Sequence, residues 1–181
     1  MVNELIRKAL HIFVCVFFLT VAYITNTPVA YLCFFGLYVG MLVLLRLGVL
    51  SLITKINRKS IGHHLIFVGC LIIFSFFILS KDDTAFQFGI ITLMLADTLA
   101  IAGRPIQNLL SKRRSSSGKS ILGSMIFFVV SLIIAFFLHI NISPIFITSM
   151  ILLAVAEHKS TMGFDNVIIP VFSFVIVHFI A

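Results

Sequence analysis

The sequence predicts an all-α integral membrane protein, a compact bundle of about seven transmembrane helices. Hydrophobic residues make up 61% of its 181 residues and only 10% are charged, whereas a soluble domain has roughly 25% charged residues. The mean hydropathy is +1.21, and a water-soluble fold could not bury that much apolar surface. The apolar residues form continuous runs, which favour helices over the alternating pattern of a membrane barrel.

Seven apolar segments divide the chain, each near the length that crosses the hydrocarbon core of a bilayer. They cover about 9–25, 28–45, 64–80, 84–102, 120–138, 143–157 and 166–181, within a single transmembrane domain over 1–181. The first segment follows Arg7 and Lys8 as a signal peptide would, but no small-residue cleavage site follows it, so we expect a retained helix. Apolar and basic residues at near-helical spacing predict an interfacial amphipathic helix at about 48–60.

The basic residues predict the orientation of this bundle. Twelve of the thirteen Lys and Arg residues lie on one side of the predicted segments, and only Lys81, beside Asp82 and Asp83, lies on the other. Because Lys and Arg collect in cytoplasmic loops, we expect a cytoplasmic N-terminus and, after seven crossings, an outside C-terminus. The net charge of +7 is then mostly a topology signal, and we expect no nucleic-acid partner.

Ionisable residues at membrane depth are costly and point to function. Asp97 lies about two turns inside the cytoplasmic end of the fourth segment, and Arg104 follows seven residues later on the same face. A carboxylate and a guanidinium aligned in this way suit a metal ion and a phosphate group, although an ion pair that only joins two helices is the alternative. We expect Gly103 to end this helix in a left-handed cap.

The first helix carries four polar residues on one stripe, Glu4, Arg7, Lys8 and His11, at offsets of three, four and seven. An ordinary positive-inside anchor explains the two basic residues well. It explains the glutamate and the histidine poorly, so a functional role for the stripe is the second interpretation.

Two further polar groups lie at the last three helices. G-K-S-I-L-G-S (118–124) opens the fifth segment, where free backbone N–H groups favour an anion, although the upstream glycine and strand of a Walker A motif are missing. A-E-H-K-S-T-M-G-F-D-N (156–166) carries Glu157, Asp165 and Asn166 around one short loop, where Asp165 could also be merely an N-cap. All four groups fall on the predicted cytoplasmic side. Carboxylates interleaved with Lys and Arg suit a magnesium-bound polyphosphate, so we expect a nucleotide-using membrane enzyme that acts on a lipid.

In these residues the chain resembles the CTP-dependent polyprenol kinase family, which includes dolichol kinase, phytol kinase and the CTP-using diacylglycerol kinase. The matching pieces follow in order along nearly the whole chain: E-L-I-R-K-A-L-H (4–11), A-D-T-L-A-I-A-G-R (96–104), G-K-S-I-L-G-S (118–124) and E-H-K-S-T-M-G-F-D-N-V-I-I-P (157–170). The family usually has Gly-Asp where this chain has Ala96-Asp97, and often a further glycine after Gly-Arg that is absent here. The resemblance implies transfer of the γ-phosphate of CTP to the hydroxyl of a lipid alcohol, which is a polyprenol or dolichol, a phytol-like isoprenoid alcohol or diacylglycerol.

Residue roles follow from the same resemblance. Asp97, Asp165 and Glu157 are implied to hold Mg²⁺, and Asp97 or Asp165 to accept the proton of the lipid hydroxyl. Binding of the nucleotide phosphates is implied for Arg104, Lys119, Ser120, Gly123, Ser124 and Asn166, and for Arg7, Lys8, His11 and Glu4 of the first helix.

Two other functions are weighed against this one. A phosphatidate cytidylyltransferase-like enzyme also uses CTP but releases pyrophosphate in place of CDP, and such enzymes are typically longer, with a denser cytoplasmic Asp motif. A small membrane transporter would carry polar residues through the midplane, whereas the helix centres here are almost purely apolar. The acceptor lipid, the choice between CTP and ATP, the division of roles among the carboxylates and the oligomeric state stay open at this point.

Overall fold

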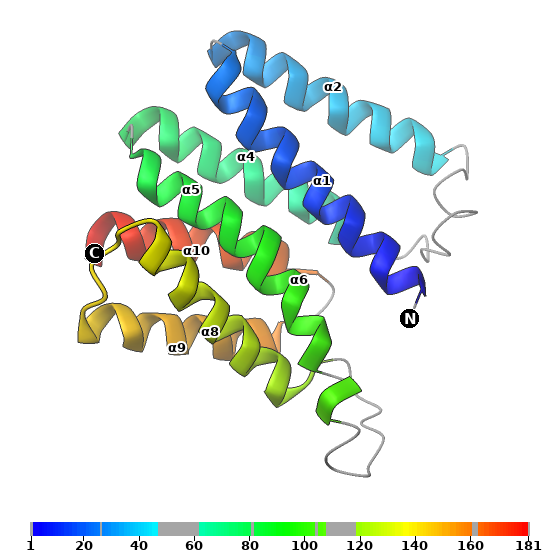
Figure 1. Cartoon of the computed structure of the whole chain (residues 1–181). Helices are drawn as coiled ribbons and strands as arrows, with labels where there is room; N and C mark the ends of the chain where they lie inside the picture. The colour runs from blue at the N-terminus through cyan, green and yellow to red at the C-terminus, as the bar shows by residue number, and fades with distance from the viewer. Residues whose placement is uncertain are drawn as a thin grey trace.

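The computed structural model is all helical over the residues it describes, which are 2–25, 27–46, 62–80, 82–103, 105–107, 119–160 and 163–180. Seven helices follow one another within these residues, which confirms the all-α prediction. They are α1 (Val2–Ile24), α2 (Thr27–Arg46), α4 (Gly62–Ser80), a fourth helix from α5 (Asp83–Ile91) through α6 (Asp97–Leu99), α8 (Ile121–Phe137), α9 (Pro144–Lys159) and α10 (Asp165–Ile180) (Figure 1). The interfacial helix predicted at about 48–60 lies outside the described residues.

The helices coincide with the predicted apolar segments to within a few residues, except at the start of the chain. There α1 begins at Val2, well before its apolar segment at 9–25, because helical hydrogen bonding continues through the polar residues of its first turns. Serine caps set two other starts: the Ser120 side chain accepts the Gly123 N–H at α8, and the Ser143 side chain accepts the Phe146 N–H at α9.

The fourth helix changes its winding just before Asp97. After α5 the chain makes a π-helical turn (Thr92–Ala96), in which the Asp97 N–H donates to the carbonyl of Thr92. A 3₁₀ turn (Ala100–Ala102) follows α6. One extra residue in a turn rotates every later side chain by roughly 100° about the helix axis, so this winding sets the direction of Asp97. Gly103 keeps a right-handed helical backbone with φ −63°, so the predicted left-handed cap is wrong.

Glycines allow the backbones of three pairs of helices to come into direct contact. A Cβ on Gly69 of α4 would lie 2.2 Å from the carbonyl oxygen of Asn166 in α10. A Cβ on Gly103 would lie 2.2 Å from the nitrogen of Gly123 in α8, so Gly103 serves helix contact in place of a cap. A Cβ on Gly89 of α5 would likewise lie 2.9 Å from the carbonyl oxygen of Pro170 in α10. These contacts fix the starts of α8 and α10 against neighbouring helices.

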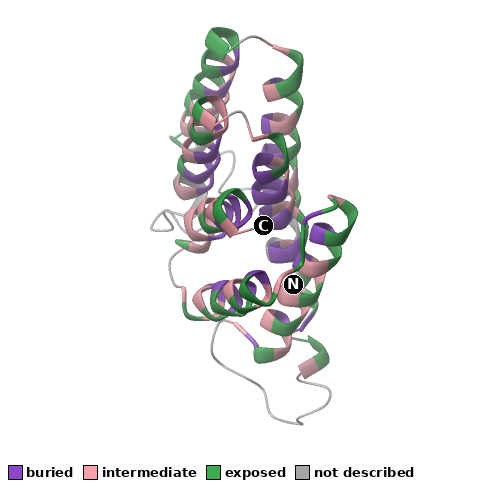
Figure 2. Ribbon diagram, turned by 90° about the vertical axis from the view of Figure 1, so that its left-hand side faces the viewer, coloured by how far each residue is buried: buried purple, intermediate pink, exposed green. Residues whose placement is uncertain are grey.

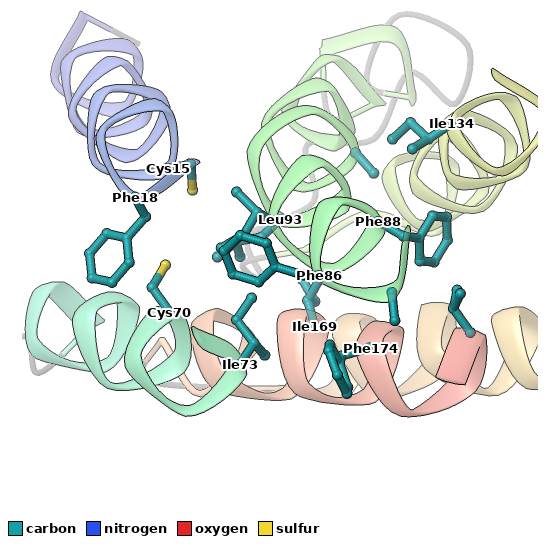
Figure 3. Close-up of a cluster of buried hydrophobic side chains, with 14 of the residues drawn as sticks. Cys15, Phe18, Cys70, Ile73, Phe86, Phe88, Leu93, Ile134, Ile169 and Phe174 are labelled. Carbon is teal, nitrogen blue, oxygen red and sulfur yellow. The ribbon is translucent and has the colours of Figure 1, made fainter. Parts of the chain in front are cut away.

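The interior of the bundle is apolar and rich in aromatic rings. Inward faces of the helices are buried and outward faces are exposed (Figure 2). In the cluster of Figure 3, Phe18 and Cys15 of α1 face Cys70 of α4, while Phe86 and Leu93 of the fourth helix lie at its centre. Phe18 also stacks on Phe34 of α2 with ring centroids 3.9 Å apart, which ties α2 to the rest.

The outward faces are apolar as well. Large hydrophobic side chains are exposed on each of the seven described helices, among them Leu32, Phe76, Ile121, Leu152 and Phe172. By length and composition, one helix found among the described residues, Asp83–Gln107, is long and apolar enough to cross a membrane. Shorter apolar helices of 10–17 residues accompany it: His11–Ile24, Thr27–Gly40, Leu65–Ser80, Ile121–Phe137 and Asp165–Ile180.

Candidate functional site

Polar side chains from five helices meet at one end of the bundle. At this end α1 begins, the fourth helix ends, α8 begins, α9 ends and α10 begins (Figure 1). Successive helices run in opposite directions, so segments that are far apart in the sequence share this end. The residues brought here are Lys8 and His11 of α1, Asp97 of α6, Lys119, Ser120, Gly123 and Ser124 around the start of α8, Glu157 of α9 and Asp165 of α10.

Three carboxylates form the centre of this site, an acidic cluster of Asp97, Glu157 and Asp165. One oxygen of each lies within 4.8 Å of the others. Asp97 and Glu157 are buried, and Asp165 is half-buried at the first turn of α10. Carboxylates at this separation repel one another strongly when water is excluded, so they require cations as partners.

Lys119 is the cation between two of these acids. Its Nζ lies 2.7 Å from Oε1 of Glu157 and 2.8 Å from Oδ2 of Asp165, and it donates to the carbonyl oxygen of Glu157 at 2.6 Å. Burial lowers the pKa of Lys119, but the carboxylates of Asp165 and Glu157 outweigh burial and hold the pKa above its ordinary value. Lys119 is therefore fully charged at neutral pH.

The first helix supplies the partners of the third acid. Lys8 Nζ contacts Oδ2 of Asp97 and also donates to the carbonyl oxygen of Asp97 at 3.2 Å. His11 Nδ1 lies 3.3 Å from the same Oδ2, and its buried Nε2 has no hydrogen-bond partner among the described residues. Both side chains act on one oxygen, so α1 fixes the orientation of the Asp97 carboxylate.

The start of α8 adds hydroxyl groups to the acidic cluster. Ser124 Oγ donates to Oε2 of Glu157 at 3.1 Å and lies 3.1 Å from Nδ1 of His158. His158 is not among the predicted site residues, although it directly follows Glu157 in the E-H-K-S segment. Because neighbouring residues of a helix point in different directions, its sequence position alone did not indicate that it would reach Ser124.

A cavity of about 50 Å³ lies among these residues. Its lining is Lys8, Asp97, Ala100, Ile101, Lys119, Ser120, Gly123, Ser124, Glu157 and Asp165. One water needs roughly 10–15 Å³ of such volume, so the cavity holds a few water-sized groups. A metal ion with its waters fits this space, whereas a nucleoside triphosphate would have to extend out of it.

Most of the predicted site residues line this cavity, and the structure places the others as follows. His11 lies beside Asp97 and reaches the cavity only through that carboxylate. Asn166 is the second residue of α10, its backbone carbonyl lies against Gly69, and it is absent from the lining formed by the described residues. The side chains of Glu4 and Arg7, and the whole of Arg104, lie outside the described part of the chain.

Comparisons with known proteins add no family assignment. No family model matches the chain, and no curated protein or solved structure is significantly similar to it. The geometry of the cavity and the four sequence motifs are therefore the basis for a functional proposal.

Proposed function

We propose that this protein is a multi-pass membrane kinase that transfers the γ-phosphate of CTP to the hydroxyl of a lipid alcohol at the cytoplasmic face. The observation that carries the proposal is the convergence of three carboxylates and two lysines on one cavity. The five residues come from all four motifs of the family resemblance: Lys8 from 4–11, Asp97 from 96–104, Lys119 from 118–124, and Glu157 and Asp165 from 157–170. All four motifs therefore contribute at least one charged side chain to the same cavity.

The surface of the bundle supports insertion in a membrane by all seven helices. The helices other than the fourth have 16 to 23 residues, or about 24–35 Å at a rise of roughly 1.5 Å per residue, close to the ~30 Å of a hydrocarbon core. Their outward faces carry exposed apolar side chains that water would not tolerate in such number. Arg46 and Lys159 end helices at the same end as the cavity (Figure 1), which favours a cytoplasmic site.

The donor set of the acidic cluster fits Mg²⁺. The cluster offers only oxygen atoms, which Mg²⁺ prefers, and three of them lie within 4.8 Å of one another. When bound by Asp97, Glu157 and Asp165, the ion would neutralise charge that develops on the transferring phosphoryl group. Lys8 and Lys119 line the same cavity and would bind phosphate oxygens, and the positive end of the α8 dipole lies beside them.

The acceptor would reach this site from the bilayer. Ala100 and Ile101 give the cavity an apolar wall, and the neighbouring Leu99 and Ile121 side chains are exposed on the outside of the bundle. The lipid hydroxyl attacks the γ-phosphorus, the new oxygen–phosphorus bond forms, and the bond from the γ-phosphorus to the bridging oxygen breaks, which releases CDP. Asp97 or Asp165 accepts the hydroxyl proton.

The test is product identification with the purified full chain. CTP and ATP, each labelled in the γ-phosphate, are incubated with Mg²⁺ and a panel of polyprenol, a phytol-like isoprenoid alcohol, diacylglycerol and phosphatidate. The proposal predicts a labelled lipid phosphate and CDP. Labelled pyrophosphate together with a CDP-lipid from phosphatidate would identify a cytidylyltransferase instead, and folded protein that labels no lipid with either nucleotide would overturn the proposal.

A further inference from the structure

The Nζ atom of Lys119 lies between Glu157 and Asp165, two of the three acids of the acidic cluster. An ammonium group has three N–H donors, and the three close acceptors of Lys119 are two oxygens of Glu157 and one of Asp165, at 2.6–2.8 Å. Two of these acceptors are carboxylate oxygens of the acids that would hold Mg²⁺. Lys119 is thus fully engaged with these two acids.

We propose that Lys119 couples metal binding to nucleotide binding. Without nucleotide, its ammonium group takes the place of the metal ion between Glu157 and Asp165; a bound polyphosphate draws the ammonium away and the metal takes its place. This inference rests on the proposed function, since it takes the acidic cluster as a magnesium site and the lining of the cavity as a phosphate site.

Mutual exclusion of the two cations follows from distance and charge. Mg²⁺ binds its oxygen ligands at roughly 2.0–2.1 Å, and Lys119 Nζ lies 2.7 Å from Glu157 Oε1 and 2.8 Å from Asp165 Oδ2. An ion bound to both oxygens would therefore lie within a few ångströms of the ammonium, with no water between them to screen the repulsion. The divalent ion enters only when Lys119 leaves.

The charge of the site explains why the metal needs a second ligand to enter. Three carboxylates and two ammonium groups give the site a formal charge of −1 with its histidines neutral, which attracts a free divalent ion only weakly. A polyphosphate brings several negative charges to the N-terminal end of α8, beside Lys119, where the helix dipole also favours an anion. Lys119 then exchanges carboxylate for phosphate partners without losing its charge pairing.

Lys119 is better suited than Lys8 to make this exchange. The Lys119 side chain is 25% exposed, whereas the Lys8 side chain is 8% exposed and held against Asp97 from α1. Lys119 also precedes α8 and is not part of a helix, so its side chain is less confined by a packed interface. Lys8 is therefore the fixed partner of Asp97, and Lys119 is the mobile one.

The experiment measures Mn²⁺ binding by electron paramagnetic resonance to the full chain in detergent, without nucleotide. Lys119→Met removes the competing charge and should tighten Mn²⁺ binding by roughly 10-fold or more, within the usual range of coupling between sites. Lys159→Met is the matched control, because Lys159 is exposed at the end of α9 and its charge acts only through solvent. It should tighten binding by about 3-fold at most.

A second measurement uses the wild-type protein and does not depend on the variant. The rate at which an amine-reactive reagent labels Lys119, followed by mass spectrometry, should rise when Mn²⁺ saturates the site. Equal Mn²⁺ affinities of Lys119→Met and Lys159→Met, or an unchanged labelling rate with Mn²⁺ bound, would refute the coupling alone. If neither the wild type nor Lys119→Met binds Mn²⁺, the metal site of the proposed function falls as well.

Discussion

Gly69→Ala is the sharpest test of how α4 packs against α10 at the site. The added Cβ would meet the Asn166 carbonyl oxygen at 2.2 Å and the Asn166 carbonyl carbon and Val167 Cα at 3.1 Å. Contacts below about 3.0 Å to backbone are not tolerated, so the helices must separate by close to 1 Å, which costs roughly 1–3 kcal/mol in a packed interior. Because Asp165 precedes Asn166 in α10, the same movement shifts one acid of the cluster.

The assay compares thermal unfolding and Mn²⁺ binding of Gly69→Ala with those of Gly36→Ala. Gly36 lies in α2 with no atom within 4 Å of an added Cβ, so alanine there should be neutral or stabilise the helix by up to about 1 kcal/mol. Gly69→Ala should lower the Tm by roughly 2–10 °C and weaken Mn²⁺ binding. If Gly69→Ala unfolds at the same temperature as Gly36→Ala, the close approach of α4 and α10 is wrong.

Three further predictions concern the Ser124 hydroxyl, Asp82 at the opposite end of the bundle, and the metal ion proposed for the acidic cluster. Ser124→Ala removes the group that joins Glu157 to His158, and loss of about 1 kcal/mol of hydrogen bonding should lower kcat roughly 5-fold and the Tm by roughly 2–4 °C; an unchanged kcat would separate Ser124 from the reaction. Burial raises the pKa of Asp82, but hydrogen bonds from the Ala85 N–H and from His178 outweigh it and leave the pKa below its ordinary value. This carboxylate therefore stabilises the fold above its unfolded-state pKa of about 4 and ceases to do so as the pH falls through the lower folded-state pKa. Asp82→Asn should lower the Tm at pH 7, and its difference from the wild type should shrink as the pH falls below about 4; a difference in Tm that does not change with pH would contradict this. Chelation by EDTA should abolish phosphoryl transfer and added Mg²⁺ should restore it, whereas full activity in EDTA would exclude a metal at the acidic cluster.

The fold was predictable from the sequence because long continuous apolar runs indicate helices directly. Each predicted segment corresponds to a helix of the structure, and its ends are displaced mainly where polar residues continue the helix, as at Val2. The π-helical turn at Thr92–Ala96 was not predictable, since its residues are as apolar as those of the helix around it. The conformation of Gly103 was mispredicted because a glycine at a helix end can either adopt a left-handed cap or allow close contact with another helix. The sequence does not show that α8 packs against Gly103, and this contact accounts for the glycine.

The site was predictable as a set of residues but not as a set of contacts. Helical spacing places Lys8 and His11 on one face of α1, but it does not say which helix that face meets. In the structure both side chains contact Asp97. Their predicted role was to bind the nucleotide phosphates. The position of Lys119 between Glu157 and Asp165 depends in the same way on the packing of α8, α9 and α10, which no single segment of the sequence encodes.

The most direct test of the acidic cluster as a catalytic centre is transfer of the γ-phosphate of CTP to the preferred lipid alcohol by three variants. Asp97→Asn and Asp165→Asn keep the shape of each side chain and remove its charge, while Asp83→Asn makes the same change at an exposed position at the start of α5, at the other end of the bundle. The first two should lose roughly 100-fold or more of the kcat and Asp83→Asn should stay within about 2-fold of the wild type, as an exposed substitution away from the site does. Folded Asp97→Asn and Asp165→Asn proteins that transfer phosphate as fast as Asp83→Asn would contradict the account.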